Sequence, residues 1–317
     1  MTKIREESDI REESAVREES RKEKISEEKY QVLLDDLRSV GSLAVAFSGG
    51  VDSTFLLHAA HEALGDGVIA ISAVSASFPE RELEEAKAIC RTWGIRHRSC
   101  RIHQMEIPGF AQNPPDRCYL CKKAIFQEIG RLAGEEGFAE VAEGSNLDDE
   151  GDYRPGMRAI RELGVHSPLR KAGLTKAEIR FLSRKAGLPT WKKPSLACLA
   201  TRFVYGETIT EEKLKMVELA EQYLWDLGFS QLRVRVHGNL ARIELPLEEM
   251  GRMWEQGLRE QVDTYFRKIG FAYVALDLRG YRTGSMNETL SPDKDAQGES
   301  TKRKGPEKGK PERTLGK

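Results

Sequence analysis

The stretch at residues 43–60, LAVAFSGGVDSTFLLHAA, constrains the fold more strongly than any other part of the chain. An apolar run at 43–47 stops at a small, polar, glycine-containing turn, and a second apolar run begins at Phe55. A buried strand, a tight loop and a helix in immediate succession form the basic unit of α/β domains. Ligands of such domains bind at the carboxyl ends of the parallel strands, which is where this loop falls.

The loop itself has the chemistry of an anion-binding site. Backbone N–H groups in a tight turn before a helix form an anion nest, and the helix dipole adds to the attraction. Gly49 and Gly50 let phosphate oxygens approach the backbone, while Ser48 and Ser53 offer hydroxyl donors. Asp52 is a candidate Mg²⁺ ligand, although an acid in the first turn of a helix also has a purely structural role. The loop lacks both the Gly-Lys-Ser/Thr ending of a Walker loop and the G-x-G-x-x-G spacing, so it predicts phosphate binding without γ-phosphate transfer.

Strand and helix signals alternate along the middle of the chain. Strands are predicted at 43–47, 68–74, 95–102 and 139–143, and helices at 53–64, 79–93, 119–133 and 154–163. This alternation predicts an α/β fold with a parallel sheet covered by helices on both faces. A further helix at 175–187 is predicted to begin with a capping box formed by Thr175 and Glu178.

The pattern changes near Thr210, where a smaller α+β domain is predicted. A helix at 210–227 precedes two short strands, QLRVRVHG and ARIELPL; a second helix at 247–269 and a last strand, FAYVALDL, complete it. We therefore predict a loop-containing domain at 31–203 and the small domain at 204–290. The REES repeat within 1–30 has no apolar face, and 291–317 is rich in Lys, Glu, Gly and Pro, so both are predicted to be disordered charged tails.

Composition excludes several classes of function. The chain has 50 basic and 51 acidic residues, so no bulk attraction to nucleic acid is indicated. No apolar run is long enough to span a membrane, and the charged N-terminus does not resemble a secretory signal. The expected location is the cytoplasm, where the cysteines should stay reduced or bind metal.

Three of the five cysteines are candidates for chemistry. Cys118 and Cys121 form a C-x-x-C pair at the start of a predicted helix, where the helix N-terminus and neighbouring lysines should favour thiolates. Cys198 lies in a later, irregular segment. The three could hold a [4Fe–4S] cluster with one iron open, two could form a redox dithiol, or a zinc site could form with a fourth ligand. Cys90 and Cys100 are expected to be buried as small apolar residues.

Several motifs together indicate a family. The S-G-G-x-D-S loop resembles the PP-loop of ATP pyrophosphatases, whose fold is adenine nucleotide alpha hydrolase-like. The full set resembles the LarE family, the ATP-dependent sulfur transferases of nickel-pincer nucleotide cofactor biosynthesis, which supplies lactate racemase. The match runs from about residue 30 to 290 and rests on these segments: SGGVDST, NPPDRCYLCK, EGSNLDD, KPSLACLATRFVYG, LRVRVHG, ARIEL and DLRGYRTGSMNE.

The resemblance implies a two-step reaction on a small mononucleotide. ATP and Mg²⁺ convert a carboxylate of a pyridinium dicarboxylate mononucleotide to an acyl adenylate, and a sulfur nucleophile then displaces AMP. Some family members give up a cysteine sulfur, and that cysteine corresponds to Cys198. Others carry three cysteines and resemble cluster-using enzymes, which favours a [4Fe–4S] cluster on Cys118, Cys121 and Cys198, loaded by sulfide or another donor. The resemblance also implies a homo-oligomer, with a hexamer possible, joined through the small domain.

Further polar residues are predicted to bind the nucleotides. Ser145, Asn146 and Asp149 follow a predicted strand and could contact ribose, adenine or Mg²⁺, unless they form a merely solvated acidic loop. Arginine suits the bidentate binding of phosphate, so the following residues are candidates for the substrate phosphate: Arg202, Arg233 and Arg235. Glu221 is expected to be a surface acid rather than a metal ligand or base.

Three other functions fit parts of the pattern. Some tRNA-thiolating enzymes also join a PP-loop to three cluster cysteines, but they need a basic face or an RNA-binding module. An amide-forming ligase would leave the cysteines unexplained. A nucleotide sensor would bind ATP without releasing pyrophosphate.

Overall fold

A computed structural model describes residues 2–151, 155–194, 197–282 and 284–285 of the chain. The predicted tail at 291–317 and the last residues of the predicted small domain lie outside these ranges. In the part of the chain that is described, no helix combines the length and apolar character needed to cross a membrane.

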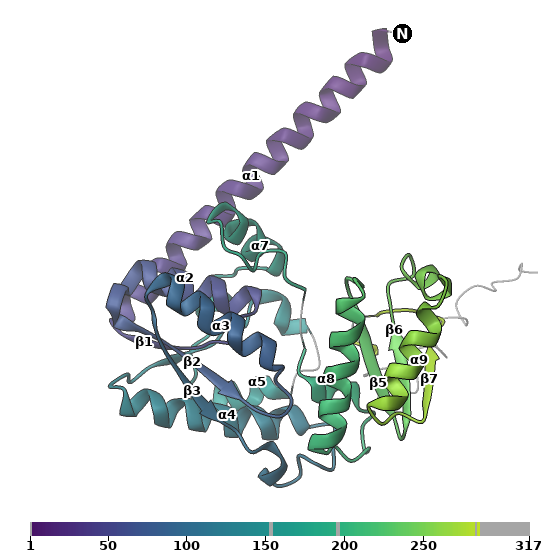
Figure 1. Ribbon diagram of the computed structural model, residues 1–317. Helices are drawn as coiled ribbons and strands as arrows, with labels where there is room; N and C mark the ends of the chain where they lie inside the picture. Colours follow the sequence, from purple (N-terminus) through teal and green to yellow (C-terminus); the bar gives the residue numbers. More distant parts are fainter. Residues whose placement is uncertain (1, 152–154, 195–196, 283, 286–317) are drawn as a thin grey trace, which may run out of the picture. The chain divides into compact units, whose positions relative to one another are not determined.

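A four-stranded parallel sheet forms the centre of the loop-containing half (Figure 1). Its strands are β1 (Leu43–Ala46), β2 (Val68–Val74), β3 (Arg96–Arg101) and β4 (Val141–Ala142), in the order β3-β2-β1-β4. The helices between them are α2 (Val51–Leu64), α3 (Glu80–Trp93) and α4 (Arg117–Glu135), and α5 (Gly156–Glu162) follows β4. The predicted α/β class and all four strand positions are confirmed, with β4 shorter than expected.

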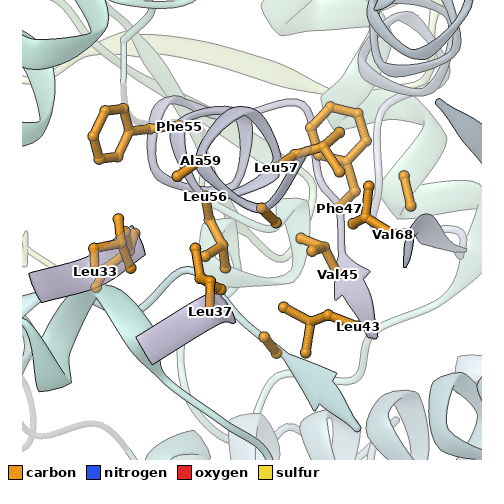
Figure 2. Close-up of a cluster of buried hydrophobic side chains, with 14 of the residues drawn as sticks. Leu33, Leu37, Leu43, Val45, Phe47, Phe55, Leu56, Leu57, Ala59 and Val68 are labelled. Atoms are coloured by element: carbon orange, nitrogen blue, oxygen red, sulfur yellow. The ribbon is translucent and has the colours of Figure 1, made fainter. Parts of the chain in front are cut away.

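The main core lies where α1 and α2 pack against this sheet (Figure 2). Leu33 and Leu37 of α1 meet Phe55 and Leu56 of α2 over the buried face of β1, which contributes Val45. All five side chains are almost fully removed from water. Each such side chain stabilises the fold by about 1.5–3 kcal/mol, so this packing fixes the strand after which the glycine loop begins.

Helix α1 (Thr2–Val40) differs from the expected disordered tail at 1–30. Its last turns are anchored by the buried leucines and by an ion pair of 2.7 Å between Lys29 and Glu178. Tyr30 also donates a hydrogen bond of 2.6 Å to Glu62 of α2. Once these turns are fixed, each further residue adds a helical hydrogen bond, and the Glu and Arg of the REES repeat favour helix. The predicted boundary between residues 30 and 31 therefore falls inside a continuous helix.

Two shorter helices follow β4: α6 (Pro168–Lys171) and α7 (Lys176–Lys185). The capping box predicted at the start of α7 is confirmed. The Thr175 hydroxyl accepts from the Glu178 N–H at 3.3 Å, and the Glu178 carboxylate accepts from the Thr175 N–H at 2.8 Å. This cap fixes the position of Lys176, which reaches the glycine loop.

The small sheet has the order β5-β6-β7, with β5 and β6 antiparallel and β6 and β7 parallel. Its elements are α8 (Glu211–Asp226), β5 (Arg233–His237), β6 (Leu240–Glu244), α9 (Leu258–Lys268) and β7 (Tyr273–Leu276). The predicted α-β-β-α-β order is confirmed. The second helix begins at Leu258 instead of residue 247, because Gly257 holds a φ of 79° that interrupts helical geometry.

The second core crosses the predicted domain boundary at residue 203. Leu199, Ala200 and Phe203 lie in the same buried cluster as the apolar residues of α8, β5 and β6. Phe203 also forms a parallel bridge with Val236 of β5. The segment that follows Cys198 is therefore held by the small sheet.

Candidate functional site

The glycine loop joins β1 to α2 in a conformation that requires glycine. Gly49 has a φ of 69°, and a Cβ atom there would lie 3.3 Å from the Cβ of Ala86 in α3. Gly50 stands at the N-cap of α2. The Ser48 N–H donates to the Ser53 hydroxyl at 3.3 Å, which closes the loop on the first turn of the helix. The backbone is thus folded tightly around the positive end of the α2 dipole.

Asp52 is brought together with two residues from distant segments. Its carboxylate forms an ion pair of 2.5 Å with Lys176 of α7 and accepts a hydrogen bond of 3.4 Å from the Asn146 side chain. The Asn146 N–H in turn donates to the Asp149 carboxylate at 2.9 Å. A Cβ atom on Gly144 would lie 3.0 Å from the Ser53 nitrogen, so the loop after β4 lies directly against the start of α2.

Ser145 lies beside a buried acid. Its hydroxyl donates to Glu143 at 2.7 Å, and the Ser167 hydroxyl donates to the other oxygen of the same carboxylate at 2.6 Å. These two bonds offset the cost of burying the Glu143 side chain at the end of β4. Ser145 therefore shapes the wall of the site, and its predicted contact with a nucleotide stays a prediction.

Two cavities meet at the glycine loop. We call the first, of about 320 Å³, the strand-end cavity; the residues that identify it are Phe47, Ile71, Phe126, Ile129, Ser145 and Asp149. We call the second, of about 420 Å³, the cysteine cavity, because Cys118, Cys121 and Cys198 all line it. Ser48, Gly50 and Asp52 line both. A molecule bound across the loop would therefore extend into an apolar space on one side and reach three sulfurs on the other.

The three predicted cysteines come together from two segments. Cys118 and Cys121 lie in the first turns of α4, and Cys198 directly precedes the short 3₁₀ helix Leu199–Arg202. Cys198 is exposed, whereas Cys121 is buried. Burial raises the pKa of Cys121 to about 12, and the nearby Cys198 and Cys118 sulfurs add to the effect. Burial thus opposes the thiolate form that was expected for this cysteine, and the Gln104 hydrogen bond and the Arg117 charge oppose the rise in its pKa.

Arg117 and Asn113 tie the two cysteine segments to each other. The buried Arg117 guanidinium donates to the Ala200 carbonyl at 2.8 Å and to the Asn113 side-chain oxygen. Asn113 donates to the Val204 carbonyl at 2.7 Å. Among the described residues Asn113 is the only non-glycine with a positive φ, at 53°. Asn113 and Arg117 both belong to the NPPDRC motif, but their roles could not be derived from sequence spacing.

Lys193 is a further cation that the sequence did not single out. Its ammonium donates to the Gly49 carbonyl at 3.2 Å and forms ion pairs of 2.6 Å with Glu82 and Glu85 of α3. Burial raises the pKa of Glu82, and the Lys193 charge opposes that shift. Lys193, Lys176 and Lys122 all line the cysteine cavity. Their ammonium groups suit a ligand with several negative charges.

The three thiols of the cysteine cavity can be compared with the donors that a zinc ion or an iron–sulfur cluster takes. Across the described ranges, no three His, Cys, Asp or Glu side chains are placed to share a single metal ion. A [4Fe–4S] cluster is held by cysteine thiolates, and the three thiols that line the cysteine cavity are donors of that chemical kind.

The three arginines predicted to bind a phosphate lie elsewhere. Arg202 is fully buried in an ion pair of 2.8 Å with Glu221, and Arg235 pairs with Glu244 at 3.0 Å. Burial lowers the pKa of Arg233 to about 10, and the neighbouring Arg202 charge acts in the same direction. None of the three lines the cysteine cavity or the strand-end cavity as far as the described residues show. Glu221, expected at the surface, is buried, because it neutralises Arg202 and accepts from the Val234 N–H at 2.9 Å.

Comparison with known proteins identifies the family. The pyridinium-3,5-bisthiocarboxylic acid mononucleotide synthase of Lactiplantibacillus plantarum, a LarE protein, is 36% identical over 264 residues, covering 83% of this chain and 95% of that protein. The chain belongs to the LarE family. An uncharacterised Synechocystis protein, slr1717, is 43% identical over 266 residues, covering 84% of this chain and 99% of its own length. No protein-family model matches the chain.

A third, more distant match identifies the wider group. One component of the glutamine-hydrolysing GMP synthase of Archaeoglobus fulgidus is 26% identical over 196 residues, covering 57% of this chain and 63% of that protein. This LarE family member is therefore a PP-loop protein, as the glycine loop predicted. The first two matches each cover more than four fifths of this chain.

Proposed function

We propose that this protein is an ATP-dependent sulfur transferase that converts the carboxylates of pyridinium-3,5-biscarboxylic acid mononucleotide to thiocarboxylates. The observation that carries the proposal is the shared lining of the cysteine cavity, where a PP-loop and three cysteines face the same space. The family supports the substrate, because a relative that aligns over almost its whole length is named for the bisthiocarboxylic acid product.

ATP would bind across the loop, with adenosine in the strand-end cavity. The apolar walls of that cavity suit the base, and the N–H groups around Gly49 and Gly50 would receive the β- and γ-phosphates. Asp52 would accept Mg²⁺ after exchanging its contact with Lys176, whose ammonium would then be free to contact a phosphate. Lys193 lies against the Gly49 carbonyl and would neutralise the pyrophosphate as it leaves.

The chemistry needs activation because a carboxylate is a poor electrophile. A carboxylate oxygen of the substrate attacks the α-phosphorus of ATP, the bond from that phosphorus to the β-bridging oxygen breaks, and pyrophosphate leaves. Hydrosulfide then attacks the carbonyl carbon, the bond from that carbon to the AMP oxygen breaks, and AMP leaves with the electron pair. The thiocarboxylic acid releases one proton. The apolar side chains around the cysteine cavity, such as Phe78 and Phe110, would limit hydrolysis of the adenylate by water.

Cys118, Cys121 and Cys198 would hold a [4Fe–4S] cluster in this proposal. Such a cluster, when bound, supplies an open iron that carries an extra sulfide. The competing route is loss of the Cys198 sulfur, and the exposure of that thiol is compatible with it. Two findings separate the routes: the iron content of protein purified without oxygen, and the mass of iron-free protein after one turnover. Loss of one sulfur atom from iron-free protein would refute the cluster route.

The proposal also covers the oligomeric state, the sulfur donor and the cellular location of the enzyme. Exposed apolar side chains on the small domain, Leu247, Trp254 and Tyr273, support a homo-oligomer joined through that domain. Sulfide or another small sulfur donor would reload the site. The near-zero net charge supports a small-molecule substrate over nucleic acid, and the free thiols support a reducing cytoplasm.

The decisive experiment measures AMP and pyrophosphate with a panel of acceptors. Anaerobically purified protein is mixed with ATP, Mg²⁺ and sulfide in three separate reactions. The first also contains the dicarboxylate mononucleotide, the second contains unmodified tRNA, and the third contains the mononucleotide together with an ammonium salt. We expect AMP formation and thiocarboxylate product only with the mononucleotide and sulfide. Thiolated tRNA or an amide product would refute the proposal, and ATP binding without AMP formation would favour a sensor.

A further inference from the structure

Two residues outside the sequence motifs connect the cysteine segments. Ser77 lies in the loop after β2, and Gln104 lies at the start of the short 3₁₀ helix that follows β3. Because β2 and β3 are parallel neighbours, both loops leave the sheet at the same edge. Both side chains are almost completely buried. A serine and a glutamine buried beside three sulfurs need polar partners there.

A continuous series of hydrogen bonds runs through these two residues. The Cys198 thiol donates to the Ser77 hydroxyl at 3.0 Å. The Ser77 N–H donates to the Gln104 side-chain oxygen at 3.1 Å, and the Gln104 side-chain nitrogen donates to the Cys121 sulfur at 3.1 Å. The Ser77 carbonyl also accepts from the Leu199 N–H at 3.0 Å, so Ser77 holds the Cys198 segment by backbone as well as side chain.

The orientation of the Gln104 amide is determined by chemistry. A backbone N–H can only donate, so the amide oxygen must face Ser77 and the amide NH₂ must face Cys121. Cys121 therefore meets a fixed donor, which suits a sulfur that accepts, such as a ligand thiolate. The Ser77 hydroxyl can rotate, so it can accept from the Cys198 thiol or donate to a Cys198 thiolate. We call the hydrogen-bonded pair Ser77 and Gln104 the bridge. Its Gln104 end offers a fixed donor to the Cys121 sulfur, and its Ser77 end can donate to the Cys198 sulfur or accept from it.

We propose that Ser77 and Gln104 are positioning residues that hold the sulfurs of Cys198 and Cys121 in the relative positions that sulfur transfer requires. The proposal rests on the function argued above and extends it to two polar side chains in the wall of the cysteine cavity. Cys121 belongs to α4 and Cys198 to a segment held by the small sheet, so the bridge fixes sulfurs that separate elements carry. Hydrogen bonds to sulfur ligands also tune clusters, and removing such partners lowers metal affinity or activity by about 10–100-fold.

The test combines a spectroscopic signal with a comparison of the two reaction steps. The variants are Ser77→Ala, which removes the hydroxyl, Ser77→Thr, which keeps it, and Gln104→Met, which removes both amide contacts at similar volume. Ser183→Ala is the matched control, because Ser183 is a buried serine of α7 that lines neither the cysteine cavity nor the strand-end cavity in the described part of the chain. The infrared S–H stretching band of Cys198, assigned through its loss in Cys198→Ser, is recorded on reduced, iron-free protein.

We expect the Cys198 band to move to higher frequency in Ser77→Ala and to stay in place in Ser77→Thr and Ser183→Ala. The rate of thiocarboxylate formation should fall about 10–100-fold in Ser77→Ala and Gln104→Met, while AMP formation stays within about twofold of wild type. A Cys198 band that does not move refutes the bridge, whatever the enzyme does. Equal losses in both steps, or the same loss in Ser183→Ala, would show a merely structural role. Wild-type protein without AMP formation would refute the proposed function, a separate outcome that leaves the band measurement valid.

Discussion

The ion pair between Arg202 and Glu221 allows a test of whether Arg202 stabilises the fold or binds the substrate. Both side chains are buried, and the Arg202 guanidinium makes two contacts of 2.8 Å with the Glu221 carboxylate. A third hydrogen bond, of 2.8 Å, joins Arg202 to the Ala197 carbonyl beside Cys198. The perturbation is Glu221→Leu, which leaves the arginine charge without its partner.

The expected magnitude follows from the burial of both groups. Removing one partner of a buried ion pair lowers the free energy of unfolding by about 3–5 kcal/mol, because the remaining charge stays desolvated. Replacing both, as in Arg202→Met with Glu221→Leu, removes that charge. The double variant still leaves the Val234 N–H without the Glu221 acceptor, which costs about 1–3 kcal/mol. We therefore expect the double variant to be more stable than Glu221→Leu alone.

The assay is urea unfolding followed by tryptophan fluorescence. Glu218→Leu is the control. Glu218 lies one turn earlier on α8, pairs with the exposed Lys215 and accepts from the Glu80 N–H at 3.1 Å, so its loss should cost at most about 2 kcal/mol. The substrate KM of the folded double variant is measured in parallel. A double variant less stable than Glu221→Leu would refute the electrostatic reasoning. A large rise in KM with little change in stability would restore the predicted phosphate-binding role of Arg202.

Three further predictions concern the loop, the lysine beside it and the response to pH. Gly49→Ala should abolish ATP-dependent AMP formation, whereas Gly41→Ala, with a similar φ of 78° but open space around it, should lower stability by about 1–2 kcal/mol and keep AMP formation. Lys193→Met should raise the KM for ATP at least about tenfold, whereas Lys192→Met, which changes a side chain over the Trp191 ring, should not. Burial lowers the pKa of His97, so the unfolded chain binds the proton more readily below pH 6.5, and stability should fall there as the pH is lowered; His97→Gln should weaken that pH dependence in urea unfolding.

The sequence predicted the elements that depend on local patterns. Apolar runs with glycine turns located β1 and β2, and the Thr175 cap located α7, because these signals lie within a few neighbouring residues. Helix α1 was missed because its stability comes from leucines and an ion pair that reach α2 and α7, while its own REES repeat shows no apolar face. Nothing within residues 1–30 could have indicated those distant contacts.

The candidate site shows the same division between local and long-range information. The residue types of the glycine loop and of the cysteines indicate their chemistry without knowledge of their neighbours in space, so the sequence could predict them. The structure shows that they line one cavity. The phosphate-binding assignment of Arg235 relied on charge alone. Charge does not reveal that Glu244 lies on the paired strand, opposite Arg233, with its carboxylate 3.0 Å from the Arg235 guanidinium. Strand pairing, a property of the folded chain, turned an expected ligand contact into an internal ion pair.

The residues that the sequence analysis missed make contacts with residues that are distant in the sequence. Lys193 contacts Gly49, and Ser77 contacts Gln104 and Cys198, across more than twenty-five residues of sequence. Gln104 contacts Cys121 across 17 residues, so no short motif contains both partners of any of these contacts. A reaction that passes an activated carboxylate from a phosphate loop to a sulfur must hold together segments that follow three different strands. Polar side chains without chemistry of their own are suited to that task, because they fix distances without competing for the substrate. If the bridge variants lose sulfur transfer and keep adenylylation, different residues support the two steps of the reaction. The glycine loop and the cysteines are then two distinct sites that line the same cavity.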